Sequence, residues 1–186
     1  MKSKNFGLYL IIFLLMFSIN DTAKAQWIKQ QVLNPLDSFT TLYPNVVKFT
    51  DASTGYLGGS DGWFGGFPGV IYKTTNGGNN WIQVSVNTAY QVWYMDAVNS
   101  LTVYASCDSA QIIRTLTGGN SWTTLNTPPV PTNLIRWRIS FINVFTGWIT
   151  TDNESAFNKT FQTTNSGTTW TLVNPGSGFT KIKFFS

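Results

Sequence analysis

The chain of 186 residues is 42% hydrophobic and only 11% charged, and it contains 16 glycines and no histidine. This composition excludes a disordered chain and favours short strands joined by tight turns over amphipathic helices, so we expect an all-β fold. The formal charge of +4 comes without a cluster of lysine and arginine residues, which excludes the basic footprint of a nucleic-acid-binding protein.

The N-terminus has the three parts of a secretory signal peptide. Lys2 and Lys4 precede an apolar run from Phe6 to Ile19, and Ala23–Ala25 supplies small residues for cleavage before Gln26. A transmembrane anchor is the alternative, but the run is short for a bilayer and polar residues follow it at once. We therefore expect residues 1–25 to be removed. The mature protein is expected to be secreted (periplasmic, cell-surface or extracellular), without a stable membrane span.

The mature part, 26–186, begins with a segment that resembles two later ones. WIKQQVLNP at Trp27 aligns with WIQVSVNT at Trp81 and with WTLVNPGSG at Trp170. Each of the later two segments begins at the tryptophan that ends a polar octet. The chain contains three such octets, TTNGGNNW (74–81), TLTGGNSW (115–122) and TTNSGTTW (163–170). Residues 26–33 are therefore predicted to be a lone outer strand, preceding a set of repeated units.

Aligning the chain on the octets defines the repeat. One aromatic residue falls at one place in each unit, at Phe49, Tyr94, Phe141 and Phe184, with spacings of 45, 47 and 43 residues. A small residue follows each of the first three, at Gly55, Ser100 and Gly147, and Asp51 and Asp96 also take equivalent places. A period in the forties with four short strands predicts the blades of a β-propeller. We expect units at about 46–86, 92–126 and 138–174, and the start of another at 181–186.

The octet is predicted to be a tight turn between the third and fourth strands of each unit, and we call it the clasp. Asparagine or threonine side chains accept hydrogen bonds from turn amides, glycine tolerates positive φ, and the closing tryptophan brings apolar area to bury between blades. The structural residues predicted on this basis are Thr74, Asn76, Gly78, Trp81, Thr115, Thr117, Gly119, Trp122, Thr163, Asn165, Gly167 and Trp170.

These motifs resemble a known family. The pattern S/T-x-D/N-x-G-x-S/T-W is similar to the Asp-box, or BNR repeat. IYKTTNGGNNW, with FTDASTGYLGG upstream, resembles the propeller family of photosystem II stability and assembly factors. The resemblance covers Phe39 to Ser186, although no octet carries the Asp that is usual in the family. It implies about seven blades, clasps that lie away from the ligand face, and protein partners.

The number of units predicts an incomplete propeller. The chain holds about three four-stranded antiparallel blades with partial strands at both ends, whereas propellers typically have 4–8 blades. We therefore expect an open or incomplete propeller, a fragment of a longer protein in preference to a natural three-blade module. Open blade faces also predict marginal stability or self-association.

Two segments are candidates for a binding face. GGSDGWFGGFPG (58–69) carries aromatic residues that either pack beneath the loop or form a stacking platform for a sugar or peptide. Residues 126–138 carry two arginines that either grip a carboxylate or phosphate or belong to a solvated strand edge. The residues of this candidate face are Asp61, Trp63, Phe64, Phe67, Arg136, Trp137 and Arg138.

The sequence contains only weak candidates for catalytic residues. Cys107 has no histidine to activate it and is expected to be a half-buried strand residue. The chain has three arginines in all, and Arg114 sits beside a clasp, which argues against a sialidase. Asp61, Asp108 and Asp152 could converge, but nothing in their spacing shows it.

The sequence therefore predicts no metal site and no cofactor. It favours a non-catalytic, exported propeller scaffold that binds a protein or a cell-surface glycan. The alternative is a fragment of an Asp-box glycoside hydrolase of sialidase or glucanase type.

Overall fold

The computed structural model describes residues 42–62, 68–85, 90–128, 137–151 and 159–174. The chain divides into two compact units, 1–30 and 31–186, and every described residue belongs to the second. The expected signal peptide (1–25), outer strand (26–33) and start of a further unit (181–186) lie outside the described residues. Within the described ranges, no helix is long and apolar enough to cross a membrane.

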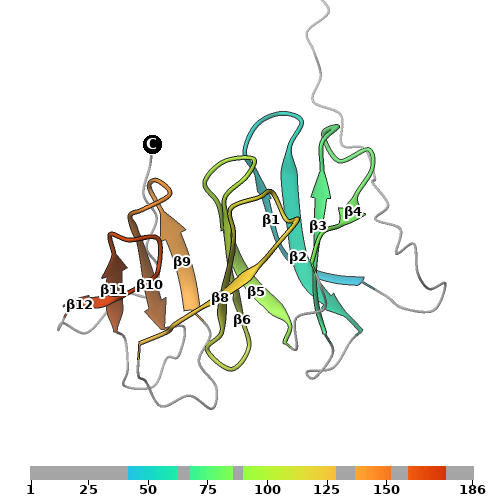
Figure 1. The fold of residues 1–186 in the computed structure, drawn as a ribbon. Coiled ribbons are helices and arrows are strands. Elements are labelled where there is room, and N and C mark those ends of the chain that lie inside the picture. Colours follow the sequence, from blue (N-terminus) through green and yellow to red (C-terminus); the bar gives the residue numbers. More distant parts are fainter. Residues whose placement is uncertain (1–41, 63–67, 86–89, 129–136, 152–158, 175–186) are drawn as a thin grey trace, which may run out of the picture. The chain divides into compact units, whose positions relative to one another are not determined.

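Three antiparallel sheets of four strands each account for the described residues (Figure 1). The first contains β1 (Leu42–Phe49), β2 (Gly55–Asp61), β3 (Gly69–Thr74) and β4 (Ile82–Gln83). The second contains β5 (Val92–Ala97), β6 (Val103–Cys107), β7 (Ile112–Thr115) and β8 (Thr123–Leu125). The third contains β9 (Trp137–Phe141), β10 (Gly147–Thr151), β11 (Thr160–Thr163) and β12 (Thr171–Asn174). We call these sheets blades 1, 2 and 3.

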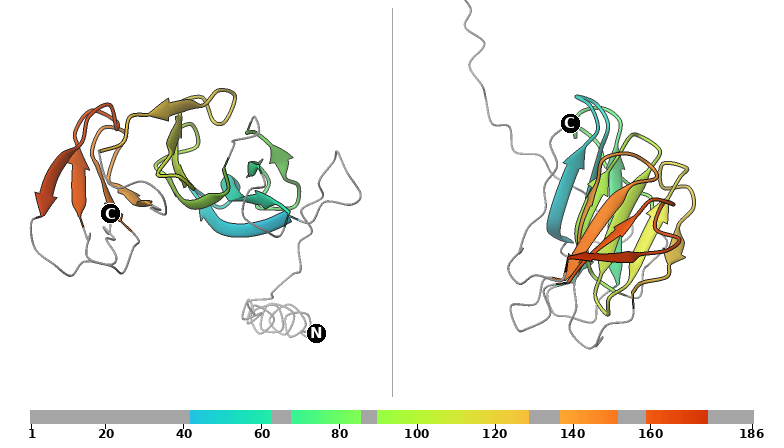
Figure 2. Two further views of the ribbon diagram at one scale, coloured as in Figure 1. Left: turned by 90° about the horizontal axis from the view of Figure 1, so that it is seen from below. Right: turned by 90° about the vertical axis from the view of Figure 1, so that its left-hand side faces the viewer.

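Within each blade the strands are hydrogen-bonded in chain order, as expected for propeller blades. The prediction of an all-β fold built from four-stranded antiparallel blades is confirmed. β1 begins at Leu42, four residues before the expected start at 46. Among the described residues the three blades do not close a ring, and they follow one another in chain order in the left view of Figure 2.

The hydrophobic core lies between neighbouring blades. One cluster joins blades 1 and 2 through residues such as Tyr56 and Ile71 of blade 1 and Val92 and Met95 of blade 2. A second cluster joins blades 2 and 3 through residues such as Tyr104 of blade 2 and Trp137 and Phe141 of blade 3. Cys107, expected to be half-buried, is fully buried in the first cluster. It therefore packs as a small apolar side chain.

The strand register corrects the sequence alignment in blade 2. Phe49 pairs with Gly55, and Phe141 pairs with Gly147, but the pair at this place in blade 2 is Ala97 with Val103. The prediction that Tyr94 takes the place of Phe49 and Phe141 was therefore wrong. Tyr94 lies three residues earlier and pairs with Ser106.

The alignment failed because the large and small residues of this strand pair change places: blades 1 and 3 have a large residue opposite glycine, and blade 2 has a small residue opposite a larger one. A Cβ on Gly147 would lie 2.3 Å from Cδ1 of Phe141, and one on Gly55 would lie 2.8 Å from the Phe49 ring, so each ring occupies the space above its glycine. In blade 2 a small Ala97 faces a larger Val103, which fills the same space from the other strand. This also explains why blade 2 lacks the glycine found in the other two.

The turn after the first strand follows the corrected register. Asp51 Oδ1 accepts hydrogen bonds from the backbone amides of Ser53 and Thr54, each at 2.8 Å. Asn99 and Asn143 make the same pair of contacts in blades 2 and 3. Asp51 therefore corresponds to these asparagines, and its predicted equivalence to Asp96 was wrong.

Ser100, which the alignment placed beside Gly55 and Gly147, lies in this turn and not at the start of a strand. The hydrogen bonds from Ser53, through its side chain and its amide, and from the Thr54 amide hold the pKa of Asp51 well below its usual range.

Candidate functional site

The three clasps share one hydrogen-bond pattern around a buried threonine. Thr74 Oγ1 accepts a hydrogen bond from the amide of Gly78 at 2.9 Å, four residues later. The same contact runs from Gly119 to Thr115 at 3.0 Å and from Gly167 to Thr163 at 2.9 Å. The three glycines have φ of 91°, 99° and 81°, a region that disfavours side chains.

The middle position of the clasp works with either an amide or a hydroxyl. Asn76 Oδ1 accepts a hydrogen bond from the Asn80 amide at 2.9 Å, and Asn165 Oδ1 makes the equivalent contact with Thr169. In blade 2, Thr117 Oγ1 accepts from the Ser121 amide at 3.0 Å. A carboxylate at this position is therefore not needed for the turn contact.

The clasp tryptophans reach the outer strand of the preceding blade. Trp122 Nε1 donates to the Val84 carbonyl at 2.9 Å, and Trp170 Nε1 donates to the Asn126 carbonyl at 3.0 Å. All three tryptophans are half-buried, so their rings lie at the edge of the core and not within it. Trp81 Nε1 is buried and has no acceptor in the described part of the chain.

Tyrosine hydroxyls and basic side chains also link neighbouring blades on the clasp side. The Tyr56 hydroxyl donates to the Ser100 carbonyl and the Tyr104 hydroxyl to the Val144 carbonyl, both at 2.7 Å. Lys73 donates to the Gly118 carbonyl at 3.2 Å, and Arg114 donates to Ser166 at 2.8 Å. The side chains on this side are used to join blades, which makes it a poor place for a ligand.

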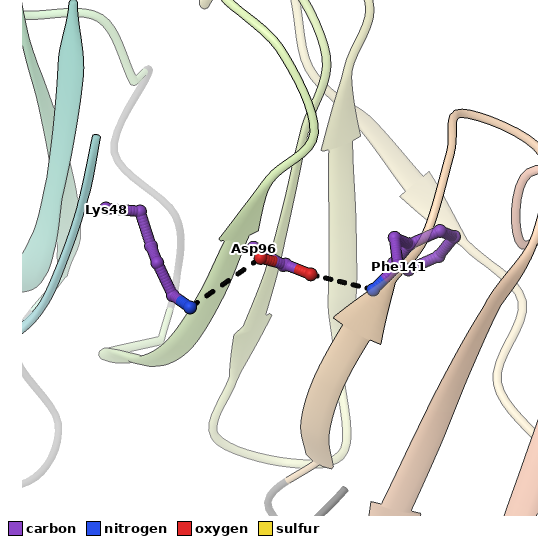
Figure 3. A network of polar contacts seen from close by, with 3 residues as sticks. All are labelled: Lys48, Asp96 and Phe141. Carbon is purple, nitrogen blue, oxygen red and sulfur yellow. Dashed lines mark hydrogen bonds and ion pairs between the residues drawn. The ribbon is translucent and has the colours of Figure 1, made fainter. Parts of the chain in front are cut away.

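The first strands of the three blades carry a polar network that the sequence did not reveal (Figure 3). Lys48 Nζ on β1 lies 3.7 Å from Asp96 Oδ1 on β5, and Asp96 Oδ2 accepts a hydrogen bond from the amide of Phe141 on β9 at 2.7 Å. Lys48 and Asp96 occupy the same register position in adjacent blades. An alignment with the correct register in blade 2 would have placed Lys48 and Asp96 at equivalent positions and so indicated this ion pair.

β1, β5 and β9 are the edge strands of their sheets, and side chains from neighbouring blades bind some of their backbone groups. Asp96 accepts from the edge amide of Phe141, and Asn45 Nδ2 donates to the Val92 carbonyl at 2.8 Å. Such contacts protect an edge strand from unwanted strand pairing. We call the row of these three strands the inner rim.

The predicted binding-face residues that the structure describes have different surroundings. Trp137 is completely buried, and its Nε1 donates to the Ala110 carbonyl at 2.9 Å, so it belongs to the core. The Arg138 guanidinium lies 4.9 Å from the centroid of the Tyr94 ring, where a cation is attracted by the aromatic face. Asp61 is half-buried at the end of β2. Trp63, Phe64, Phe67 and Arg136 lie outside the described residues.

Three of the four described carboxylates make hydrogen bonds or ion pairs within the fold. Besides Asp51 and Asp96, Asp108 accepts a hydrogen bond from Trp93 Nε1 at 2.6 Å. Burial, and secondarily the charge of Asp61, raises the pKa of Tyr72. No group of three or more potential metal ligands occurs among the described residues. Asp37, Asp152 and Glu154 are not among them.

No protein-family model matches this chain, and a search of curated proteins finds no match either. Solved structures do resemble it. "YCF48 bound to D1 peptide" matches with a TM-score of 0.58 and 18% identity over 78% of this chain, and YCF48 from Cyanidioschyzon merolae with 0.56 and 16% over 77%. The GH74 enzyme of Niastella koreensis matches with 0.53 and 20% over 71%.

The matched part of this chain spans 46% and 39% of the two YCF48 chains and 22% of the GH74 enzyme. At these identities the likeness shows the fold. The chain resembles a β-propeller of the YCF48 type, as its repeat predicted, and its described residues form an incomplete propeller of three blades.

Proposed function

We propose that this chain is an exported propeller scaffold that binds an extended segment of another protein along the inner rim. The observation that carries the proposal is that three edge strands lie side by side and present charged and aromatic side chains from three different blades. These side chains are Lys48, Tyr94, Asp96 and Arg138. The likeness to a YCF48 structure bound to a peptide supports the same class of ligand.

The geometry favours a segment that carries carboxylates. Lys48 is about half exposed, and its 3.7 Å contact with Asp96 is a long, partly solvated ion pair of small net energy. A carboxylate of the ligand can therefore share the Lys48 ammonium at little cost. Arg138 on β9 offers a second positive charge on the inner rim, where its guanidinium lies over the Tyr94 ring of β5.

Peptide binding by variants tests this proposal. Fluorescently labelled acidic nonapeptides are titrated with the protein, and basic nonapeptides serve as the ligand control. Lys48→Ala should weaken binding of the acidic peptides by about tenfold, as expected for loss of one charged contact. Lys159→Ala, which removes the same charge from the segment before β11, should change it by less than about twofold. Equal affinity for acidic and basic peptides would contradict the proposal.

Export is part of the same proposal. Its support is the charged, apolar and small-residue order of residues 2–25. N-terminal sequencing of material collected outside the cytoplasm should begin at Gln26. Recovery of the exported chain with Met1 intact would contradict cleavage.

A glycoside hydrolase fragment is the second candidate, because GH74 enzymes share the fold. Asp61 is the described carboxylate for which no hydrogen bond or ion pair is seen, at the end of β2. If the second candidate holds, the chain releases reducing sugars from soluble β-glucans and Asp61→Asn reduces that activity. Glycan binding without turnover would instead support a carbohydrate-binding scaffold.

A further inference from the structure

Blade 1 exposes two apolar side chains, each at a register position that one of the other blades buries. Val47 is 53% exposed, whereas Met95, at the same position in blade 2, is 2% exposed. Phe49 is 47% exposed, whereas Phe141, at the same position in blade 3, is 8% exposed. Met95 and Phe141 are buried because each faces the preceding blade. Blade 1 therefore presents a face built for a preceding blade.

Blade 3 exposes an apolar side chain on its outer strand, at the bulge in the pairing of β12 with β11. Val173 stands three residues after Trp170, as Leu125 stands three residues after Trp122. Leu125 is 9% exposed because the clasp glycine of the next blade, Gly167, packs against it, whereas Val173 is 42% exposed. Among the described residues, no clasp covers the outer strand of blade 3 as Gly167 covers that of blade 2.

The indole of Trp81 supplies an independent observation. In blades 2 and 3 the clasp tryptophan donates its Nε1 hydrogen to a carbonyl in the outer strand of the preceding blade. Trp81 Nε1 is buried yet has no acceptor among the described residues. A buried donor without an acceptor is costly, so a partner group for it is expected. The equivalent acceptor is a backbone carbonyl of an outer strand.

The aromatic residues of the two end faces also match. Between blades 2 and 3 the Phe141 ring stacks on the Tyr104 ring, with centroids 3.6 Å apart. At the register position of Tyr104, blade 3 has Trp148, and at that of Phe141, blade 1 has Phe49. Trp148 and Phe49 can therefore form the corresponding aromatic pair if the two faces meet.

We propose that blade 1 of one copy of this chain packs against blade 3 of a second copy. The contact repeats the internal interface: Trp81 Nε1 donates to a carbonyl of β12 in the second copy, its clasp covers Val173, and Phe49 stacks on Trp148. It joins two different surfaces, so the association is head-to-tail, and the copies form either a closed ring or an open row.

Sedimentation velocity over a dilution series of the full chain tests the proposal. The wild-type chain should associate with increasing concentration, and Val173→Lys should weaken its association constant by about tenfold, because a charge must then be buried. Leu116→Lys is the matched control. Leu116 is also an exposed apolar residue, but it lies in the clasp of blade 2, where Thr75 and Thr164 stand in the other clasps. This control should associate like the wild type.

Mixing two variants tests the head-to-tail arrangement. Trp81→Phe keeps the ring but removes the donor, so it should weaken association by several fold. Val173→Lys leaves the blade 1 face intact, and Trp81→Phe leaves the blade 3 face intact. An equimolar mixture should therefore form a heterodimer through the two intact faces, at concentrations where each variant alone is monomeric.

Three outcomes would overturn the proposal. One is a wild-type chain that stays monomeric throughout the dilution series. If the Trp81 indole hydrogen of that monomer exchanges slowly with solvent, its acceptor lies within the same chain. Another is an equal effect of Val173→Lys and Leu116→Lys. The third is a mixture that associates no better than its components, which would point to a symmetric contact.

Discussion

The interface between blades 1 and 2 and the interface between blades 2 and 3 share a tyrosine hydrogen bond but differ in their apolar contacts. In both, a tyrosine hydroxyl donates to a turn carbonyl of the next blade at 2.7 Å. Phe141, however, stacks on Tyr104 in the second interface, whereas the corresponding residue in the first is Ala97. The strand register is therefore the same in the blades, whereas the size of the side chain at a given register position differs.

This difference shows which features a blade interface requires. Polar contacts depend on the distance between a donor and a backbone carbonyl, so the positions of both groups are kept even where the donor changes from Lys73 to Arg114. Apolar contacts require a filled space, and either of two facing residues can supply the volume. The register and the hydrogen bonds therefore define the repeat more reliably than its aromatic residues do.

The largest expected effect is at Trp137, which takes the register position of Val92 in the preceding blade. Both side chains are completely buried. Trp137→Ala should lower the free energy of unfolding by about 4 kcal/mol, and Val92→Ala by about 2 kcal/mol, because the first leaves the larger cavity. Guanidinium titration measures both. Similar losses would mean that the second interface collapses around the missing ring.

The exchange of volume between the two interfaces can be tested directly. Gly147→Val places a side chain where Phe141 already lies and should cost about 3 kcal/mol. Adding Phe141→Ala reproduces the Ala97 and Val103 pair of blade 2. The double variant should therefore be more stable than the sum of the single losses predicts, by about 2 kcal/mol. Additive losses in the titration would contradict the exchange.

The shared tyrosine contacts should have smaller and equal effects. Tyr56→Phe and Tyr104→Phe each remove one hydroxyl that donates to a turn carbonyl, and each should cost about 1 kcal/mol. The same titration measures both losses. A clear effect at one site only would show that the two interfaces do not use this contact equally.

The smallest effect concerns the turn after the first strand, which has Asp51 in blade 1 and asparagine in the other blades. The folded chain holds the pKa of Asp51 below its unfolded value, so the stability that it adds is present above the unfolded pKa and is lost as pH falls. Between about pH 5 and about pH 2, Asp51→Asn should reduce the loss of stability measured by thermal unfolding. Asn143→Asp should increase it. The opposite pair of results would exclude Asp51 as a source of the pH dependence.

The local part of the fold could be predicted because it depends on residues close together in sequence. Each clasp threonine binds the amide four residues later, so three octets in register were enough to indicate three hairpins and hence the blades. The sequence alignment misplaced the first strand of blade 2 because it relied on an aromatic residue, and the aromatic residue of this strand is Tyr94, three residues before the equivalent position. In the structure, Ala97 and Val103 share the volume that a phenylalanine supplies in blades 1 and 3.

The sequence by itself determined the repeat, the strand content and the turn chemistry, because these follow from periodicity and from contacts within a few residues. Only the tertiary structure decided which residues meet across blades. Asp96 joins Lys48 to the Phe141 amide across separations of 48 and 45 positions, and the Trp81 indole has no acceptor among the described residues, unlike its two counterparts. Such contacts depend on how neighbouring sheets are placed against each other, and no local pattern in the chain records that placement.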